Sequence, residues 1–174
     1  MSNVSSETGS DNLTETSHGW LSDEDLQSTR ARVPIVYVDA VPVRVDGLGR
    51  VTEIGMLLRQ AADGTLSRMV VSGRVLFGEL LREALVRHCE KDLGELAFPR
   101  VPPNPSPFTV VEYFPDPDRS GFYDPRHHAV SMAYVVPIEG DCEPTQEALD
   151  MEWYSPEEAV SPEVIAEDRK STRL

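Results

Sequence analysis

The feature that most constrains the fold of this chain is an amphipathic helix that follows a glycine-containing loop. Residues 66–72 are mostly apolar and predict a strand, which ends at Gly73. Residues 80–93 predict a helix, because apolar residues recur at every fourth position and form one buried stripe. The stripe consists of Leu81, Leu85, Cys89 and Leu93. A strand, a loop and a helix therefore follow one another over residues 66–93.

The polar residues of this loop and helix resemble a Nudix box, whose pattern is G-x5-E-x7-R-E-U-x-E-E-x-G-U with U apolar. The residues that match at the family spacing are Gly73, Glu79, Arg87 and Gly94. Cys89 stands at the apolar position after the central acid, and Asp92 is a shortened carboxylate at the second of the paired acids. The central acid, the first paired acid and the last apolar residue are replaced by His88, Lys91 and Glu95.

These replacements change the charge on one helix face. An α-helix turns 100° per residue, so His88, Lys91 and Asp92 project within an arc of about 100°. Three glutamates would carry a charge of about −3 there, whereas neutral histidine, lysine and aspartate sum to roughly zero. Magnesium prefers several hard oxygen ligands, and a protonated lysine has no acceptor. The sequence therefore predicts a weakened affinity for a divalent ion.

The resemblance implies a Nudix-like α/β/α sandwich with a mixed sheet. It also implies that Arg87 pairs with Glu79 and braces the loop against the helix. A Nudix enzyme would need Mg²⁺ or Mn²⁺, for which Glu79 and Asp92 would remain as ligands. The candidates to complete such a metal site from outside the box are His127, His128, Glu143 and Asp150.

Two functions remain open from the sequence. One is a binding protein for a nucleoside-diphosphate-type ligand, in which hydrolysis is weak or lost and Lys91 neutralises a ligand phosphate. The other is an active Nudix hydrolase that cleaves a nucleoside diphosphate linked to another moiety, such as ADP-ribose. We favour the first, because the box has lost acids. The candidate catalytic residues are Glu79, Arg87, His88, Lys91 and Asp92, and the candidate substrate-binding residues are Gly73, Arg74, Arg126 and His128.

A long polar loop separates the strands predicted at residues 108–114 and 128–138, and loops of this length often bind ligands. Its segment Asp124-Pro-Arg, followed by Val130-Ser-Met-Ala-Tyr, resembles the Nudix branch that handles ADP-ribose and related NAD metabolites. Neighbouring residues on a strand face opposite ways, so at most one of His127 and His128 is expected to point into a cleft.

Strands are also predicted at residues 33–46 and 51–59, ahead of the box. Ser22 is placed to cap a helix over residues 23–30, with Asp25 at the capping-box position. A last strand ends at Tyr154, and Ser155 is followed by Pro156 and Glu158, which predicts a capped closing helix. Many Nudix domains close in this way.

Length and composition indicate a single domain, because 174 residues with 40% hydrophobic content can form one core. We expect a disordered acidic tail at residues 1–19, one Nudix-like domain at 20–165 and a charged end at 166–174.

The net charge of −14 disfavours nucleic acids and anionic membranes, and no run approaches the roughly 20 apolar residues of a membrane span. Two cysteines are too few for a disulfide framework. We therefore expect a cytoplasmic protein that binds a nucleotide-like small molecule, and the resemblance adds a homodimer as an option. A DNA-binding regulator is disfavoured, since no further domain follows.

Overall fold

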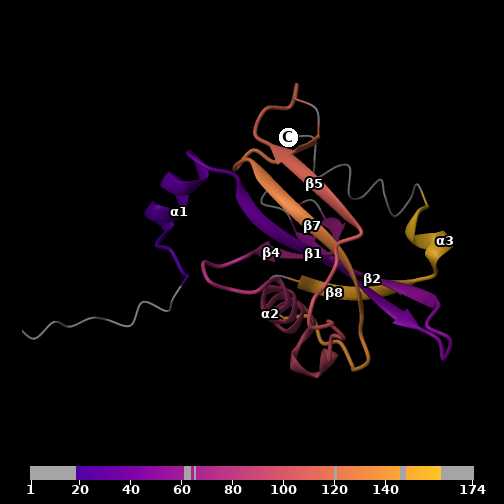
Figure 1. The fold of residues 1–174 in the computed structure, drawn as a ribbon. Coiled ribbons are helices and arrows are strands. Elements are labelled where there is room, and N and C mark those ends of the chain that lie inside the picture. The colour runs from indigo at the N-terminus through magenta and orange to yellow at the C-terminus, as the bar shows by residue number, and fades with distance from the viewer. Residues whose placement is uncertain (1–18, 61–63, 65, 120, 146–147, 162–174) are drawn as a thin grey trace, which may run out of the picture.

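The computed structural model describes residues 19–60, 64, 66–119, 121–145 and 148–161, which form a mixed sheet and its helices (Figure 1). The helices are α1 (Asp23–Arg30), α2 (Leu81–Leu93) and α3 (Pro156–Ala159), with a short 3₁₀ helix, η1 (Glu95–Ala97). The strands are β1 (Ile35–Val45), β2 (Val51–Gln60), β3 (Leu66–Met69), β4 (Val71–Arg74), β5 (Thr109–Phe114), β6 (Phe122–Tyr123), β7 (Ala129–Pro137) and β8 (Ala148–Tyr154). Within these ranges no helix is long and apolar enough to cross a membrane. The tail predicted at residues 1–19 lies outside them except for Gly19, and the end predicted at 166–174 lies outside them entirely.

The sheet is organised around β1, in the order β3-β2-β1-β7-β5-β6, with β4 also paired to β1 and β8 to β2. β1 runs parallel to β7, from Ile35 opposite Ala129 to Val43 opposite Pro137. It runs antiparallel to β2 and β4. The predicted α/β class with a mixed sheet is therefore confirmed.

The single strand predicted at residues 66–72 is wrong, since the chain forms two short strands there. β3 pairs with β2, whereas β4 pairs with β1 after a break at Val70. An apolar run does not reveal a change of partner strand, because both halves look equally suited to a sheet. The change brings Gly73 next to Val38 on the central strand, and so places the box loop beside the middle of the sheet.

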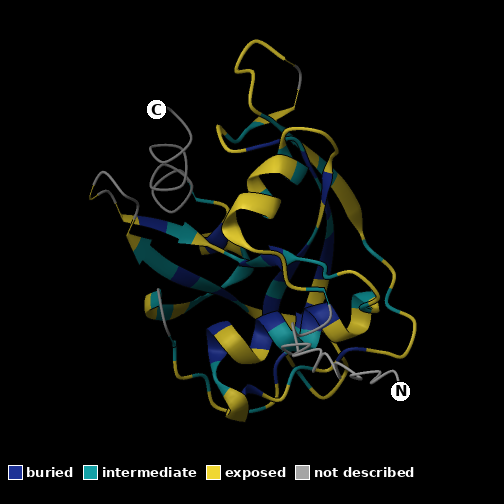
Figure 2. Cartoon of the chain, turned by 90° about the vertical axis from the view of Figure 1, so that its left-hand side faces the viewer, coloured by how far each residue is buried: buried dark blue, intermediate teal, exposed yellow. Residues whose placement is uncertain are grey.

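Helix α2 packs against β1 and β4 and covers the core (Figure 1). Buried residues gather where this helix meets the sheet (Figure 2). The predicted stripe is confirmed at Leu85, Cys89 and Leu93, which are buried, whereas Leu81 is only partly buried. Burial raises the pKa of Cys89 to about 12, as expected for a thiol in the core. The buried face is wider than the stripe, because Ala84, His88 and Asp92 are also buried.

The serines predicted to cap α1 and α3 do so. Ser22 Oγ accepts a hydrogen bond from the backbone N–H of Asp25 at 3.1 Å and donates to that residue's carboxylate at 2.7 Å. The capping box predicted at Asp25 is wrong, because this carboxylate accepts from the Ser22 hydroxyl and not from the Ser22 backbone N–H. At α3, Ser155 Oγ accepts from the Glu158 N–H at 3.3 Å, and Glu158 Oε2 accepts from the Ser155 N–H at 2.9 Å. Both helices therefore begin where the short polar side chains placed them.

The long polar loop contains structure of its own. Residues Phe122 and Tyr123 form β6, which runs parallel to the end of β5. The Asp124 N–H then donates to the carbonyl of Phe114 at 2.9 Å. These contacts hold the segment before β7 against the sheet, and so position Arg126 and the two histidines that follow it.

Candidate functional site

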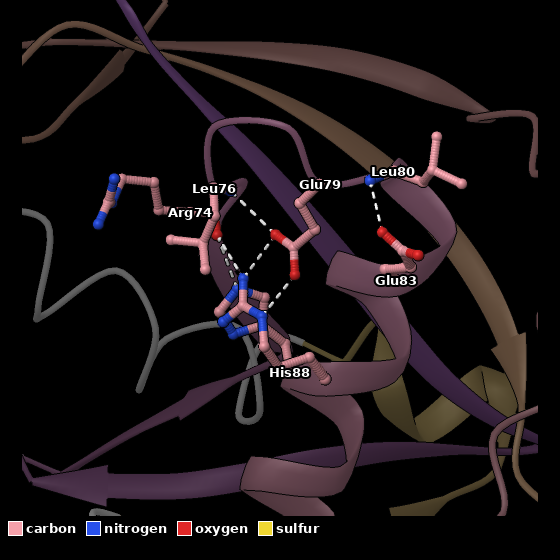
Figure 3. A network of polar contacts seen from close by, with 7 residues as sticks. Arg74, Leu76, Glu79, Leu80, Glu83 and His88 are labelled. Atoms are coloured by element: carbon pink, nitrogen blue, oxygen red, sulfur yellow. Dashed lines mark hydrogen bonds and ion pairs between the residues drawn. The ribbon is translucent and has the colours of Figure 1, made fainter. Parts of the chain in front are cut away.

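The loop between β4 and α2 is fixed to the helix by Arg87 and Glu79 (Figure 3). Arg87 Nε donates to Glu79 Oε1 at 2.6 Å, and Nη2 donates to Oε2 at 2.8 Å. Nη2 also donates to the Arg74 carbonyl at 3.0 Å, and the Leu76 N–H donates to Glu79 Oε2 at 2.9 Å. The hydrogen bonds from Arg87 lower the pKa of Glu79 and hold it as a carboxylate. The brace predicted from the resemblance is therefore present.

We predict that Arg87→Lys weakens this brace. A lysine ammonium is a point charge and cannot make the two parallel hydrogen bonds of a guanidinium, so the free energy of unfolding should fall by about 1.5 kcal/mol. Chemical denaturation measures the change. Arg50→Lys is the matched control, because Arg50 is exposed and pairs with Asp46 in the turn after β1; it should leave stability unaltered. Equal stability of Arg87→Lys and the native protein would contradict the bracing role.

His88 stands where the box has its central acid, and it packs beneath Gly73. A Cβ built on Gly73 would lie 1.9 Å from His88 Cε1, so only glycine leaves room for the ring. His88 Nε2 lies 3.0 Å from the Arg74 carbonyl oxygen, which can only accept, so Nε2 carries the hydrogen (Figure 3). Burial lowers the pKa of His88 and favours the neutral ring. The side chain thus joins the helix to β4.

Asp92, the last carboxylate of the box, is bound to an arginine from outside it. Arg59 Nη2, on β2, lies 2.6 Å from Asp92 Oδ2. The Asp92 side chain is only 4% exposed, and burial raises its pKa while the charge of Arg59 opposes that effect. Sequence reasoning missed Arg59, because a basic residue late in an amphipathic strand gives no sign of its partner.

Lys91 and Glu83 lie on the exposed side of α2. The Lys91 carbonyl accepts a hydrogen bond from the Thr145 hydroxyl, while no carboxylate among the described residues pairs with its ammonium. Glu83 accepts from the Leu80 N–H at 2.9 Å (Figure 3). Arg87, four positions further along α2, is turned to Glu79 and away from Glu83.

These side chains do not fit a divalent ion at the box. Both oxygens of Glu79 accept from Arg87, and the Asp92 carboxylate holds Arg59. Magnesium needs several free oxygen ligands at short range, and here each carboxylate is already neutralised by a guanidinium. Across the part of the chain that the structure describes, no group of three or more His, Cys, Asp and Glu is placed to hold a metal ion. The outside candidates Glu143 and Asp150 are both exposed and do not complete a site.

The chain just before α1 crosses the box loop. The Arg87 guanidinium lies 5.5 Å from the centre of the Trp20 ring, which is a cation–π arrangement. Gly19 packs so closely on the loop that an added Cβ would lie 2.9 Å from Leu76 Cβ. The Trp20 contact was not foreseen, since nothing local in the sequence links residues so far apart.

A cavity of about 660 Å³ lies where α1 meets the starts of β1 and β7. Its polar lining residues are Gln27, Arg30, Arg32, Arg126, His127 and His128. We call it the arginine pocket. Of the candidate substrate-binding residues, Arg126 and His128 line it, whereas Gly73 and Arg74 do not. Both histidines line the pocket, because they precede β7 and are not subject to strand alternation; that at most one of them points into a cleft stays a prediction.

Comparison with known proteins places the chain in a family. The family profile Domain of unknown function (DUF4916) matches residues 16–173. No curated protein sequence compared with the chain matches it. A crystal structure described as a possible asymmetric diadenosine tetraphosphate (Ap4A) hydrolase, from Jonesia denitrificans, is 57% identical with a TM-score of 0.76. That similarity covers 78% of this chain and 86% of the Jonesia chain.

More distant structures share the architecture. The Nudix domain of Shewanella oneidensis NrtR, in complex with ADP-ribose, is 15% identical with a TM-score of 0.52, over 87% of this chain and 99% of that domain. A MutT Nudix hydrolase from Burkholderia pseudomallei is 19% identical with a TM-score of 0.53, over 82% of this chain and all of that one, 100%. Identities this low show the fold alone. The chain belongs to the DUF4916 family, and its fold is that of the Nudix hydrolases.

Proposed function

We propose that this protein binds a nucleoside-diphosphate-type ligand and that metal-dependent hydrolysis at the box is weak or lost. The observation that carries the proposal is the buried ion pair between Arg59 and Asp92. It neutralises the last box carboxylate, and a metal ion could use Asp92 only after displacing Arg59. Leaving either charge buried without its partner is strongly unfavourable.

The ligand class is supported by the related structures. The Jonesia relative is described as acting on a dinucleoside polyphosphate, and the NrtR domain is described as holding ADP-ribose. Both ligands contain adenosine joined to a chain of phosphates. Lys91 offers this protein an exposed ammonium on the face where the family places a metal, so it would neutralise a phosphate directly. Gly73 and Arg74 lie at the start of the same loop.

The second candidate function is an active hydrolase for a nucleoside diphosphate linked to another moiety. It is favoured by the intact pair of Arg87 and Glu79 and by the description of the Jonesia relative. It requires Asp92 to leave Arg59, and so it differs from the first candidate in its response to metal ions. The two functions can therefore be separated by one titration.

We predict that ADP and ADP-ribose bind equally well in chelator and in millimolar Mg²⁺. The reason is that an added metal ion finds no unpaired carboxylate at the box to bind, so it cannot strengthen the binding of the nucleotide. Isothermal titration calorimetry measures both affinities, and AMP formation measured on the same samples should stay at background. Lys91→Gln should weaken binding several-fold, whereas Arg50→Gln removes a charge in the turn after β1 and should not. A tenfold gain in affinity with Mg²⁺, about 1.4 kcal/mol of coupling, would establish the hydrolase instead.

A further inference from the structure

We infer that the arginine pocket is an anion site for a phosphate-bearing small molecule, separate from the box. No residue of the box lines this cavity, so the inference goes beyond the proposed function and does not depend on it. On β1, Tyr37 is paired with Arg74 at the start of the box loop, four positions beyond the lining residue Val33.

The first argument is the charge of the pocket. The whole chain carries a net charge of −14, yet Arg30, Arg32 and Arg126 converge on one cavity from two distant segments. The nearest acids are Asp124, which pairs with Arg126, and Glu112, whose carboxylate lies 4.0 Å from His128. Three guanidinium groups against two carboxylates leave about one positive charge with both histidines neutral. A local excess of this sign attracts anions that the rest of the surface repels.

The second argument is the position of Arg126. It makes a forked pair with Asp124, with Nε to Oδ1 at 2.9 Å and Nη2 to Oδ2 at 2.6 Å, which holds its guanidinium in place. The hydrogen bond to Asp124 raises the pKa of Arg126 and keeps its charge. Guanidinium groups are suited to carboxylate and phosphate oxygens, and Arg30 and Arg32 line the same cavity.

The third argument is the state of His127. Its side chain is buried, with the residue only 2% exposed, and neither ring nitrogen has a hydrogen-bond partner. Its ring stacks on Tyr37, with centroids 5.4 Å apart and planes 16° apart. Burial lowers the pKa of His127, and Arg126 and Arg30 act in the same direction. Both nitrogens are buried, so the His127 ring forms part of the wall of the pocket, where a bound anion would change the electric field at the ring.

Size and chemistry together indicate the ligand class. Small-molecule sites commonly enclose about 300–1,000 Å³, and this cavity of about 660 Å³ can hold a molecule the size of a nucleotide. Guanidinium groups recognise phosphate by paired hydrogen bonds. A phosphorylated metabolite, bound without a metal ion, suits the arginines of this pocket.

The test is a titration of the full chain with inorganic pyrophosphate in the presence of a chelator. Calorimetry measures the affinity, and NMR observes the side-chain nitrogens of the histidines. We expect saturable binding that weakens with ionic strength, together with a shift of the His127 nitrogens. Arg32→Gln should weaken it at least tenfold, and because Arg32 is exposed the variant should fold.

A matched control separates this site from the rest of the surface. Arg50→Gln makes the same change of charge in the turn after β1 and should bind pyrophosphate like the native protein. Absence of binding at millimolar pyrophosphate overturns the inference, as does unchanged affinity in Arg32→Gln. Failure of the proposed function would appear separately, as absence of nucleotide binding while pyrophosphate still binds the pocket.

Discussion

Replacing Arg59 with methionine should lower the free energy of unfolding by about 3 kcal/mol at neutral pH, because it leaves the Asp92 carboxylate buried without its cation. Chemical denaturation measures the loss. Arg59→Met combined with Asp92→Leu should recover much of it, since apolar residues of similar size often replace a buried ion pair at little cost. A double-mutant cycle with no coupling energy would show that the two side chains do not depend on each other.

The pH dependence of the Arg59→Met variant follows from the direction of the Asp92 pKa. Burial raises the pKa of this acid in the folded state, and losing Arg59 raises it further. An acid whose pKa is higher when folded stabilises the protein at low pH and loses that contribution as the pH rises through the folded pKa. The loss in free energy of unfolding caused by Arg59→Met should therefore be largest at neutral pH. It should shrink as the pH falls toward the ordinary pKa of an aspartate. A shortfall that grows with acidity would contradict this account.

Replacing Gly73 with alanine should lower the free energy of unfolding by about 2–3 kcal/mol, because the new methyl group would overlap the buried ring of His88. The matched control is Gly47→Ala, where an added Cβ meets nothing within 4 Å. His88→Ala makes room for the methyl, so the double variant should be less destabilised than the sum of the two single variants. Additive losses would mean that the ring and the glycine do not pack together.

Together these variants test whether the box has become a structural element. His88 fills the space beneath Gly73, and Asp92 holds Arg59. The two positions, which in the family serve a metal ion, here join α2 to β4 and β2.

The sequence by itself determined the features that depend on residues close together along the chain. The spacing of apolar residues predicted α2 and most of its buried stripe, and Ser22 and Ser155 predicted where two helices begin. The brace between Glu79 and Arg87 was implied by the resemblance to the Nudix box, and the loop and the helix after it bring the two residues together. Helix periodicity and capping act over a few residues, so they can be read from the order of side chains.

Tertiary structure alone decided the partners of residues far apart in the chain. Arg59 and Asp92 are 33 positions apart and meet only because β2 and α2 pack in the same domain. The arginines of the pocket form no basic run in the sequence; they are Arg30, Arg32 and Arg126. They share one pocket because β1 lies parallel to β7, which brings the starts of both strands to one edge of the sheet. The division of residues 66–74 into β3 and β4 likewise depends on which strand each half meets. Periodicity specifies which face of an element is buried, but the neighbour that covers it is set by the pairing of the whole sheet.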